Sequence, residues 1–193
     1  YFEALRGDIR RIFRTAYNVD SRFFYPIGDD TPLKGTYGCL LITADKGLAG
    51  AYNQNAIRVA QELLDRHPDT KLFVVGEYGR RFFDQRKIPI EHSFLYTAQN
   101  PTMARAREIS ALLLDGFDRG ELKEIYVIYT DMESAMSFQA RTARLLPFHR
   151  THFAGAPAGG GAMTERFEFY PDVGTVLDSV MRSYVTGFIY SAL

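Results

Sequence analysis

Hydrophobic runs alternate along the chain with segments whose hydrophobic positions recur every three or four residues. The runs at 37–43, 71–76 and 124–129 lack polar alternation, which is typical of strands buried on both faces of a sheet. Helical periodicity marks the segments 78–85 and 103–117. Strands that alternate with helices in this way predict βαβ units. We therefore expect an α/β fold, a three-layer Rossmann-like domain with a mostly parallel sheet.

Three further segments extend this arrangement. A helix with hydrophobic positions up to Leu64 should follow the first strand, with Asn53 or Asn55 as its N-cap. The segment 88–94 could form a short edge strand, because a proline interrupts it. Apolar and polar residues alternate at 138–144, as expected for a strand with one face in water, and this strand could pair antiparallel with 166–170.

Both ends of the chain carry amphipathic helical patterns without stop signals. No capping residue precedes the first helix, and Pro171 suits the first turn of the last one. We expect the end of an N-terminal helix at 1–24, a globular α/β domain at 25–170 and the start of a C-terminal helix at 171–193. Both helices are expected to continue outside this sequence into a coiled coil.

Composition narrows the class of protein. The chain has 193 residues, 46% of them hydrophobic, which suits one domain with a hydrophobic core. Its 23 basic and 23 acidic residues leave no net charge, so nucleic acid is not an expected partner. Cys39 is the only cysteine, and its apolar surroundings predict a buried thiol in a reducing compartment. No run of about 18 apolar residues predicts a transmembrane segment.

The turn at 45–50, between the first strand and the next helix, is the strongest candidate for chemistry. Strand ends beside helix N-termini bind anions in doubly wound sheets. However, Lys46 precedes Gly47 and Gly50, which does not fit a Walker loop, and only two glycines are present where a dinucleotide loop needs three. A phosphate- or nucleotide-binding Rossmann-like enzyme therefore remains an alternative function, as does a stand-alone interaction module.

Other candidate sites are weaker still. His149 and His152 are three residues apart and could share a metal ion, but no third ligand of clear geometry accompanies them. No serine or cysteine has an evident activating base. We therefore expect no catalytic residues, no cofactor and no metal site.

The stretch 42–53, Ile-Thr-Ala-Asp-Lys-Gly-Leu-Ala-Gly-Ala-Tyr-Asn, resembles the first strand, turn and helix of gamma subunits of F-type ATP synthases. In that family, Thr/Ser-Asp-Arg/Lys-Gly-Leu-Cys/Ala-Gly is typical. Further similarity follows in the same order at 75–79, at 124–129, at 139–147, which closes on Leu-Leu-Pro, and from Tyr170 through the final helix. The resemblance covers essentially the whole chain.

This resemblance implies a mechanical function without catalysis by the chain itself. A gamma subunit is the central-stalk rotor, transmitting torque between the proton-driven membrane c-ring and the alpha and beta subunits. The expected partners are the epsilon subunit and the c-ring, with alpha and beta reached through the missing helices. The expected place is the cytoplasmic face of a bacterial plasma membrane, or the matrix side of the mitochondrial inner membrane in a eukaryote.

The resemblance also suggests where those partners bind. The connection from His149 to Arg166 lies between Leu-Leu-Pro and Tyr-Pro, which places it at the foot of the stalk near the ring and epsilon. The candidate partner contacts are His149, Thr151, His152, Thr164 and Arg166. Chloroplast-type gamma chains carry a regulatory cysteine pair, which a chain whose single cysteine is Cys39 does not have.

Overall fold

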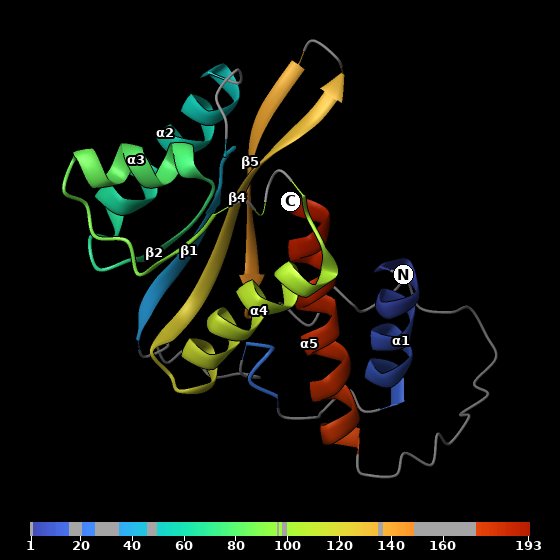
Figure 1. Cartoon of the computed structure of the whole chain (residues 1–193). Coiled ribbons are helices and arrows are strands. Elements are labelled where there is room, and N and C mark those ends of the chain that lie inside the picture. The colour runs from blue at the N-terminus through green and yellow to red at the C-terminus, as the bar shows by residue number, and fades with distance from the viewer. Residues whose placement is uncertain are drawn as a thin grey trace.

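The computed structural model describes residues 2–15, 21–25, 35–45, 50–95, 97, 100–134, 137–148 and 173–193. Figure 1 shows these residues as a twisted sheet with helices on both of its faces. The elements are, in chain order, α1 (Phe2–Thr15), β1 (Thr36–Ile42), α2 (Gly50–Arg66), β2 (Lys71–Val75), α3 (Glu77–Gln85), β3 (His92–Phe94), α4 (Met103–Asp118), β4 (Leu122–Ser134), β5 (Ser137–Leu146) and α5 (Val173–Ala192).

The strands form one sheet in the order β3-β2-β1-β4-β5. The first four are parallel to one another, and β5 runs antiparallel to β4 at the edge. This confirms the predicted α/β class with a mostly parallel sheet. The strand predicted at 138–144 pairs with β4, whereas the proposed pairing with 166–170 lies outside the described residues.

Side chains of each central strand point alternately into two hydrophobic cores. On one face, Cys39 and Leu41 of β1 pack with α2 and α3. On the other, Leu40 and Ile42 pack with α4 and α5. All four are at most 1% exposed, which explains why β1 has an uninterrupted apolar sequence.

The C-terminal helix α5 is part of the second core and not an appendage. Its residues Leu177, Met181, Val185 and Ile189, each four positions after the last, are at most 2% exposed against this core. Figure 1 shows α1 beside α5, running in the opposite direction, so that the two ends of the chain lie at the same end of this pair. Among the described helices, none combines the length and hydropathy needed to cross a bilayer.

Two element boundaries differ from the prediction for identifiable reasons. The helix α2 begins at Gly50, so neither Asn53 nor Asn55 is its N-cap. Asn53 is fully buried, and its Oδ1 accepts a hydrogen bond of 2.9 Å from the Ala44 N–H. The strand β4 continues to Ser134, past the end of its pairing with β1, because β5 supplies hydrogen-bond partners along the extension.

Candidate functional site

The carboxyl ends of β1 and β2 form the edge at which a doubly wound sheet would bind an anion. Thr43 follows β1 and is fully buried there. Its N–H and its hydroxyl both donate to the Val75 carbonyl, at 2.9 and 2.7 Å. The same hydroxyl accepts from the Gly79 N–H at 3.0 Å. One threonine therefore ties the end of β1 to the end of β2 and to the first turn of α3.

The backbone donors at the start of α3 are all used by the chain itself. The Glu77 N–H donates to Asp45 Oδ1 at 3.2 Å, and the Tyr78 N–H donates to the Ala44 carbonyl at 3.1 Å. The Gly79 N–H binds Thr43, as described above. In a phosphate-binding turn, such N–H groups point at the ligand. Here the Asp45 carboxylate and its neighbours occupy that place, so the start of α3 is joined to the end of β1 within the chain.

Two glycines allow this close approach. Gly76 has a φ of 96°, and a Cβ there would lie 2.3 Å from the Thr43 carbonyl oxygen. A Cβ at Gly79 would lie 2.8 Å from Val74 Cγ1. Both glycines of the Val-Gly-Glu-Tyr-Gly segment are therefore required by packing, Gly76 against Thr43 and Gly79 against Val74 and Thr43.

Glu77 is the most perturbed carboxylate at this edge. Arg80 Nε donates to it at 2.8 Å and Arg81 Nε at 2.9 Å. These hydrogen bonds, with Arg80 contributing most, lower the pKa of Glu77 to about 2. A carboxylate that stays ionised down to that pH, with two arginines attached, does not serve as a proton donor near neutrality.

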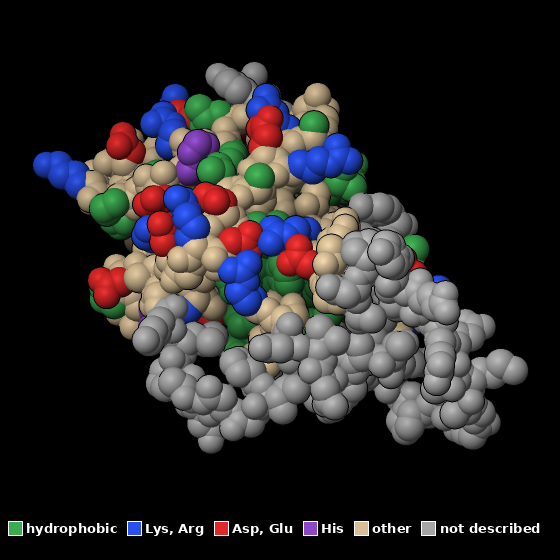
Figure 2. All heavy atoms as spheres, turned by 90° about the horizontal axis from the view of Figure 1, so that it is seen from below, with side chains coloured by type: hydrophobic (Ala, Val, Ile, Leu, Met, Phe, Trp, Pro, Cys, Tyr) green, Lys and Arg blue, Asp and Glu red, His purple; other side chains and the backbone are tan. Residues whose placement is uncertain are grey.

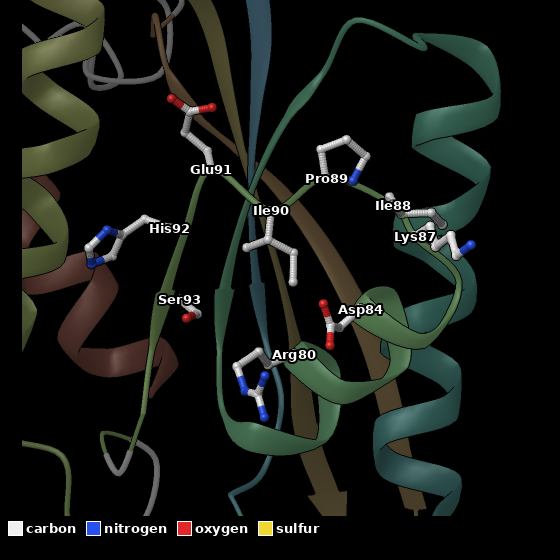
Figure 3. Close-up of a pocket in the computed structure, with 9 residues that line it drawn as sticks. All are labelled: Arg80, Asp84, Lys87, Ile88, Pro89, Ile90, Glu91, His92 and Ser93. Atoms are coloured by element: carbon white, nitrogen blue, oxygen red, sulfur yellow. The ribbon is translucent and has the colours of Figure 1, made fainter.

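A groove of about 600 Å³ lies between α3 and the segment that leads into β3 (Figure 3). Arg80 and Asp84 reach toward it from α3, and Ile90 and Ser93 face them, whereas His92 points away. His92 instead lies against the ring of Phe94, with 4.6 Å between the ring centres. Charges of both signs line the groove, so it carries no signature of a particular charged ligand.

The candidate partner contacts from the sequence, His149, Thr151, His152, Thr164 and Arg166, all lie outside the described residues. The same holds for residues 46–49 of the turn. In the described part of the chain, no three histidine, cysteine or carboxylate side chains are placed to hold a metal ion. Cys39 is fully buried, as predicted, and burial raises its pKa to about 12.

One polar cluster was not predicted from the sequence. Asp118, the last residue of α4, accepts hydrogen bonds from Arg182 of α5 at 2.9 and 3.1 Å and from Arg22 at 2.8 Å. Arg22 also donates to the Asp118 carbonyl at 2.6 Å. The three residues are far apart in the chain, and no spacing rule connects them. The only signal is a charged residue, Arg182, inside the apolar stripe of the last helix.

Sequence comparisons place the whole chain in one family. The profile of the family described as ATP synthase matches residues 1–193. The ATP synthase gamma chain of Ruminiclostridium cellulolyticum is 32% identical over 98% of this chain and 65% of its own length. That of Caldanaerobacter subterraneus is 38% identical over 80% of this chain and 54% of its own length. The chain thus spans about two thirds or less of these curated relatives.

Solved structures show a similar fold. A chain of the Tetrahymena thermophila mitochondrial ATP synthase, described as central stalk and c-ring, superposes with a TM-score of 0.66 at 18% identity, covering 99% of this chain and 85% of that one. A chain of the Euglena gracilis mitochondrial ATP synthase rotor gives 0.57 at 15% identity, covering 99% and 75%. At these identities, the likeness concerns the fold.

Proposed function

This chain belongs to the ATP synthase gamma-chain family, and on that premise we propose that it is the globular part of a central-stalk rotor subunit. In this function, it transmits torque between a membrane c-ring and the catalytic alpha and beta subunits, and has no catalytic activity of its own. The observation that carries the proposal is the antiparallel pair α1 and α5. The first residues of α1 and the last residues of α5 lie at the same end of this pair (Figure 1). Such a pair can extend as a two-helix shaft in one direction.

The packing of the domain suits mechanical transmission. A close-packed interior has low compressibility and transmits strain. Here the strands β1 and β2 are buried between helices on both faces, and the edge that could have been a binding crevice is closed by Thr43 and Asp45. A body built in this way turns as a unit when a force is applied to its surface.

The partners follow from the same proposal. We propose that the domain binds the epsilon subunit and rests on the c-ring through His149, Thr151, His152, Thr164 and Arg166, and that alpha and beta are reached through longer α1 and α5 helices. The division into 1–24, 25–170 and 171–193 belongs to this proposal. This protein then lies peripherally on the cytoplasmic face of a bacterial plasma membrane, or on the matrix side of the mitochondrial inner membrane in a eukaryote.

Cysteine cross-linking in the assembled complex tests this placement. Thr151→Cys and Thr164→Cys should each cross-link to epsilon or to the c-ring. Gln85→Cys, an exposed position at the end of α3, is the matched control and should give neither product above background. Exclusive cross-links from Thr151 and Thr164 to alpha or beta would contradict the proposed foot.

The nucleotide-binding alternative makes an opposite prediction. The spacing of Lys46, Gly47 and Gly50 fits neither phosphate loop, and the first N–H groups of α3 are already bonded within the chain. A titration calorimetry experiment with ATP, ADP or inorganic phosphate should therefore give no micromolar binding by the chain alone. Micromolar binding that is lost in Lys46→Ala, which removes the basic side chain of the candidate turn, would favour the enzyme hypothesis instead.

A further inference from the structure

The contact between α4 and α5 has polar ties at two separate places. Near the middle of α4, Ser110 is 2% exposed and its hydroxyl bonds to that of Thr186 at 2.9 Å. At the end of α4, Asp118 accepts from Arg182. The contacts occur in opposite order along the two helices, so α4 and α5 are antiparallel. Two ties at different points along an interface resist both sliding and twisting of one helix on the other.

Asp118 also joins a third segment to this contact. Arg22, which follows α1 in the chain, donates to both the carboxylate and the carbonyl of Asp118. Beneath these charges, the Arg182 guanidinium lies 5.4 Å from the ring centre of Phe23, which is itself 1% exposed. The carboxylate of one residue therefore connects α4, the segment after α1, and α5.

The surrounding charges make the register of α5 specific. Arg182 Nε donates to Asp178 at 2.8 Å, one helical turn earlier on the same face of α5. A slip of α5 by one turn, about 5.4 Å, in one direction would bring Asp178 opposite Asp118. Like charges at such a distance repel. A slip in the other direction would leave Asp118 opposite Thr186 and without Arg182. Apolar side chains alone would tolerate such shifts better, because they are not directional.

We propose that Asp118, Arg182 and Arg22 form a register lock, which holds the helix α5 in place on the globular domain when torque passes between them. The proposal rests on the rotor function proposed above. If a force applied to the globular domain is transmitted to α1 and α5, the contacts between α4 and α5 bear part of it. Asp118 is then a positioning residue, acting through α5 and touching no nucleotide or ion.

The test uses the complete protein assembled with its partner subunits in membrane vesicles. Asp118→Asn is compared with Asp115→Asn, one turn earlier on α4. Asp115 pairs only within its own helix end, with Arg119 at 2.6 Å, among the contacts of described residues. ATP hydrolysis is measured with an ionophore present, and ATP-driven ion pumping is measured with a dye that reports membrane potential. The ratio of pumping to hydrolysis is the readout, because loss of intact complexes alone lowers both in proportion.

We expect Asp118→Asn to keep its hydrolysis rate but to lose pumping per ATP as the opposing potential rises, whereas Asp115→Asn matches the unmodified complex. Hydrogen exchange along α5 should become roughly tenfold faster in Asp118→Asn, the equivalent of one lost charged hydrogen bond. Arg182→Lys keeps the charge but not the fork of donors, and should give an intermediate pumping ratio. If the complex with Asp118→Asn does not assemble, the pumping ratio of the Arg182→Lys complex tests the proposal instead.

Three outcomes separate the possible failures. An unchanged pumping ratio in both Asp118→Asn and Arg182→Lys would overturn the register lock while leaving the rotor function intact. A proportional fall in hydrolysis and pumping would reduce the cluster to an ordinary stabilising contact, and so would also overturn it. An unmodified complex in which this protein is absent from the rotor, or is dispensable for pumping, would instead overturn the proposed function.

Discussion

Asp45 and Asp118 each lie just beyond or at the end of a regular element, and each accepts hydrogen bonds from a distant part of the chain. Asp45 is half-buried and binds a backbone N–H at the start of α3, beside the fully buried Thr43 and the buried Gly76. Asp118 binds two arginine side chains at the partly exposed rim between α4 and α5. The first contact fixes the geometry within one sheet edge, whereas the second joins the domain to a helix that packs on it.

This difference has a physical basis. At the sheet edge, the buried Gly79 N–H has no water to turn to, so losing the Thr43 hydroxyl as its acceptor costs the full desolvation penalty. Arginines at a rim can be rehydrated, so losing Asp118 costs less free energy, but it removes the feature that makes one register better than its neighbours. We therefore expect changes at the sheet edge to affect folding most, and changes at the rim to affect mechanics most.

The largest effect is expected from Gly76→Ala. The new Cβ would lie 2.3 Å from the Thr43 carbonyl oxygen at a φ of 96°, so clash and backbone strain add. The free energy of unfolding should fall by about 4 kcal/mol in urea denaturation. Gly120→Ala is the matched control, because its φ of 75° is also positive but no atom lies within 4 Å of the new Cβ. That control should lose only about 1 kcal/mol. Equal losses in the two variants would mean that the approach to Thr43 costs nothing.

Thr43→Val should cause the next largest loss of unfolding free energy. The substitution keeps the shape but removes the hydroxyl that donates to Val75 and accepts from Gly79 in a fully buried place. An unfolding free energy lower by about 2 kcal/mol is expected, with an unchanged denaturant m-value. Thr43→Ser, which keeps the hydroxyl, should recover more than half of this loss, and a serine variant as unstable as the valine one would place the effect in packing.

At the rim, Asp118→Asn should lower the free energy of unfolding by only about 1 kcal/mol, since the Asp118 and Arg182 side chains are 28% and 34% exposed. Asp115→Asn, whose pair with Arg119 is more exposed, should change it by less than about 0.5 kcal/mol. Chemical denaturation of both variants measures the difference. A loss at Asp118 as large as that of Thr43→Val would remove the contrast between the two regions.

The smallest effect concerns pH. Arg80 and Arg81 lower the pKa of Glu77 from 4.5 to about 2. As the pH falls, the Glu77 carboxylate therefore takes up a proton at a lower pH in the folded state than in the unfolded chain. Its contribution to stability is therefore complete above about pH 4.5 and disappears as pH falls toward 2. Glu77→Gln should be less stable by under about 1 kcal/mol at neutral pH, with the difference vanishing near pH 2 in urea titrations at several pH values. A difference that does not change with pH would contradict the assignment.

The sequence alone predicted the central part of the fold well, for a reason visible in β1 and β2. Strands buried on both faces need continuous apolar residues, and such runs are easy to recognise. The N-terminus of α2 was predicted wrongly because Asn53, which looks like a capping residue, is used for a tertiary contact with Ala44. The pairing of β5 with β4 was not predicted either, because the choice of neighbour for an edge strand leaves little trace in local pattern.

The candidate site divides in the same way. The spacing of Lys46, Gly47 and Gly50 argued against a phosphate loop, and this stays a prediction because residues 46–49 lie outside the described residues. At the end of the neighbouring strand β2, the first N–H groups of α3 are bonded within the chain, which no local pattern predicted. The members of the register lock come from three segments that meet only in the folded chain, so the charged Arg182 within the apolar stripe of α5 was the one signal in the sequence. The predicted contacts at His149 and Arg166 stay predictions, since they lie outside the described residues.

The position of α1 against α5 also has a consequence for how the chain folds. Nearly the whole sequence separates these two neighbours, so their contact is as non-local as this chain allows. The entropic cost of closing such a long loop is met when the intervening domain brings its ends together. During synthesis, α5 is made last of the described elements, so its contact with α1 can form only when nearly all of this sequence has been made.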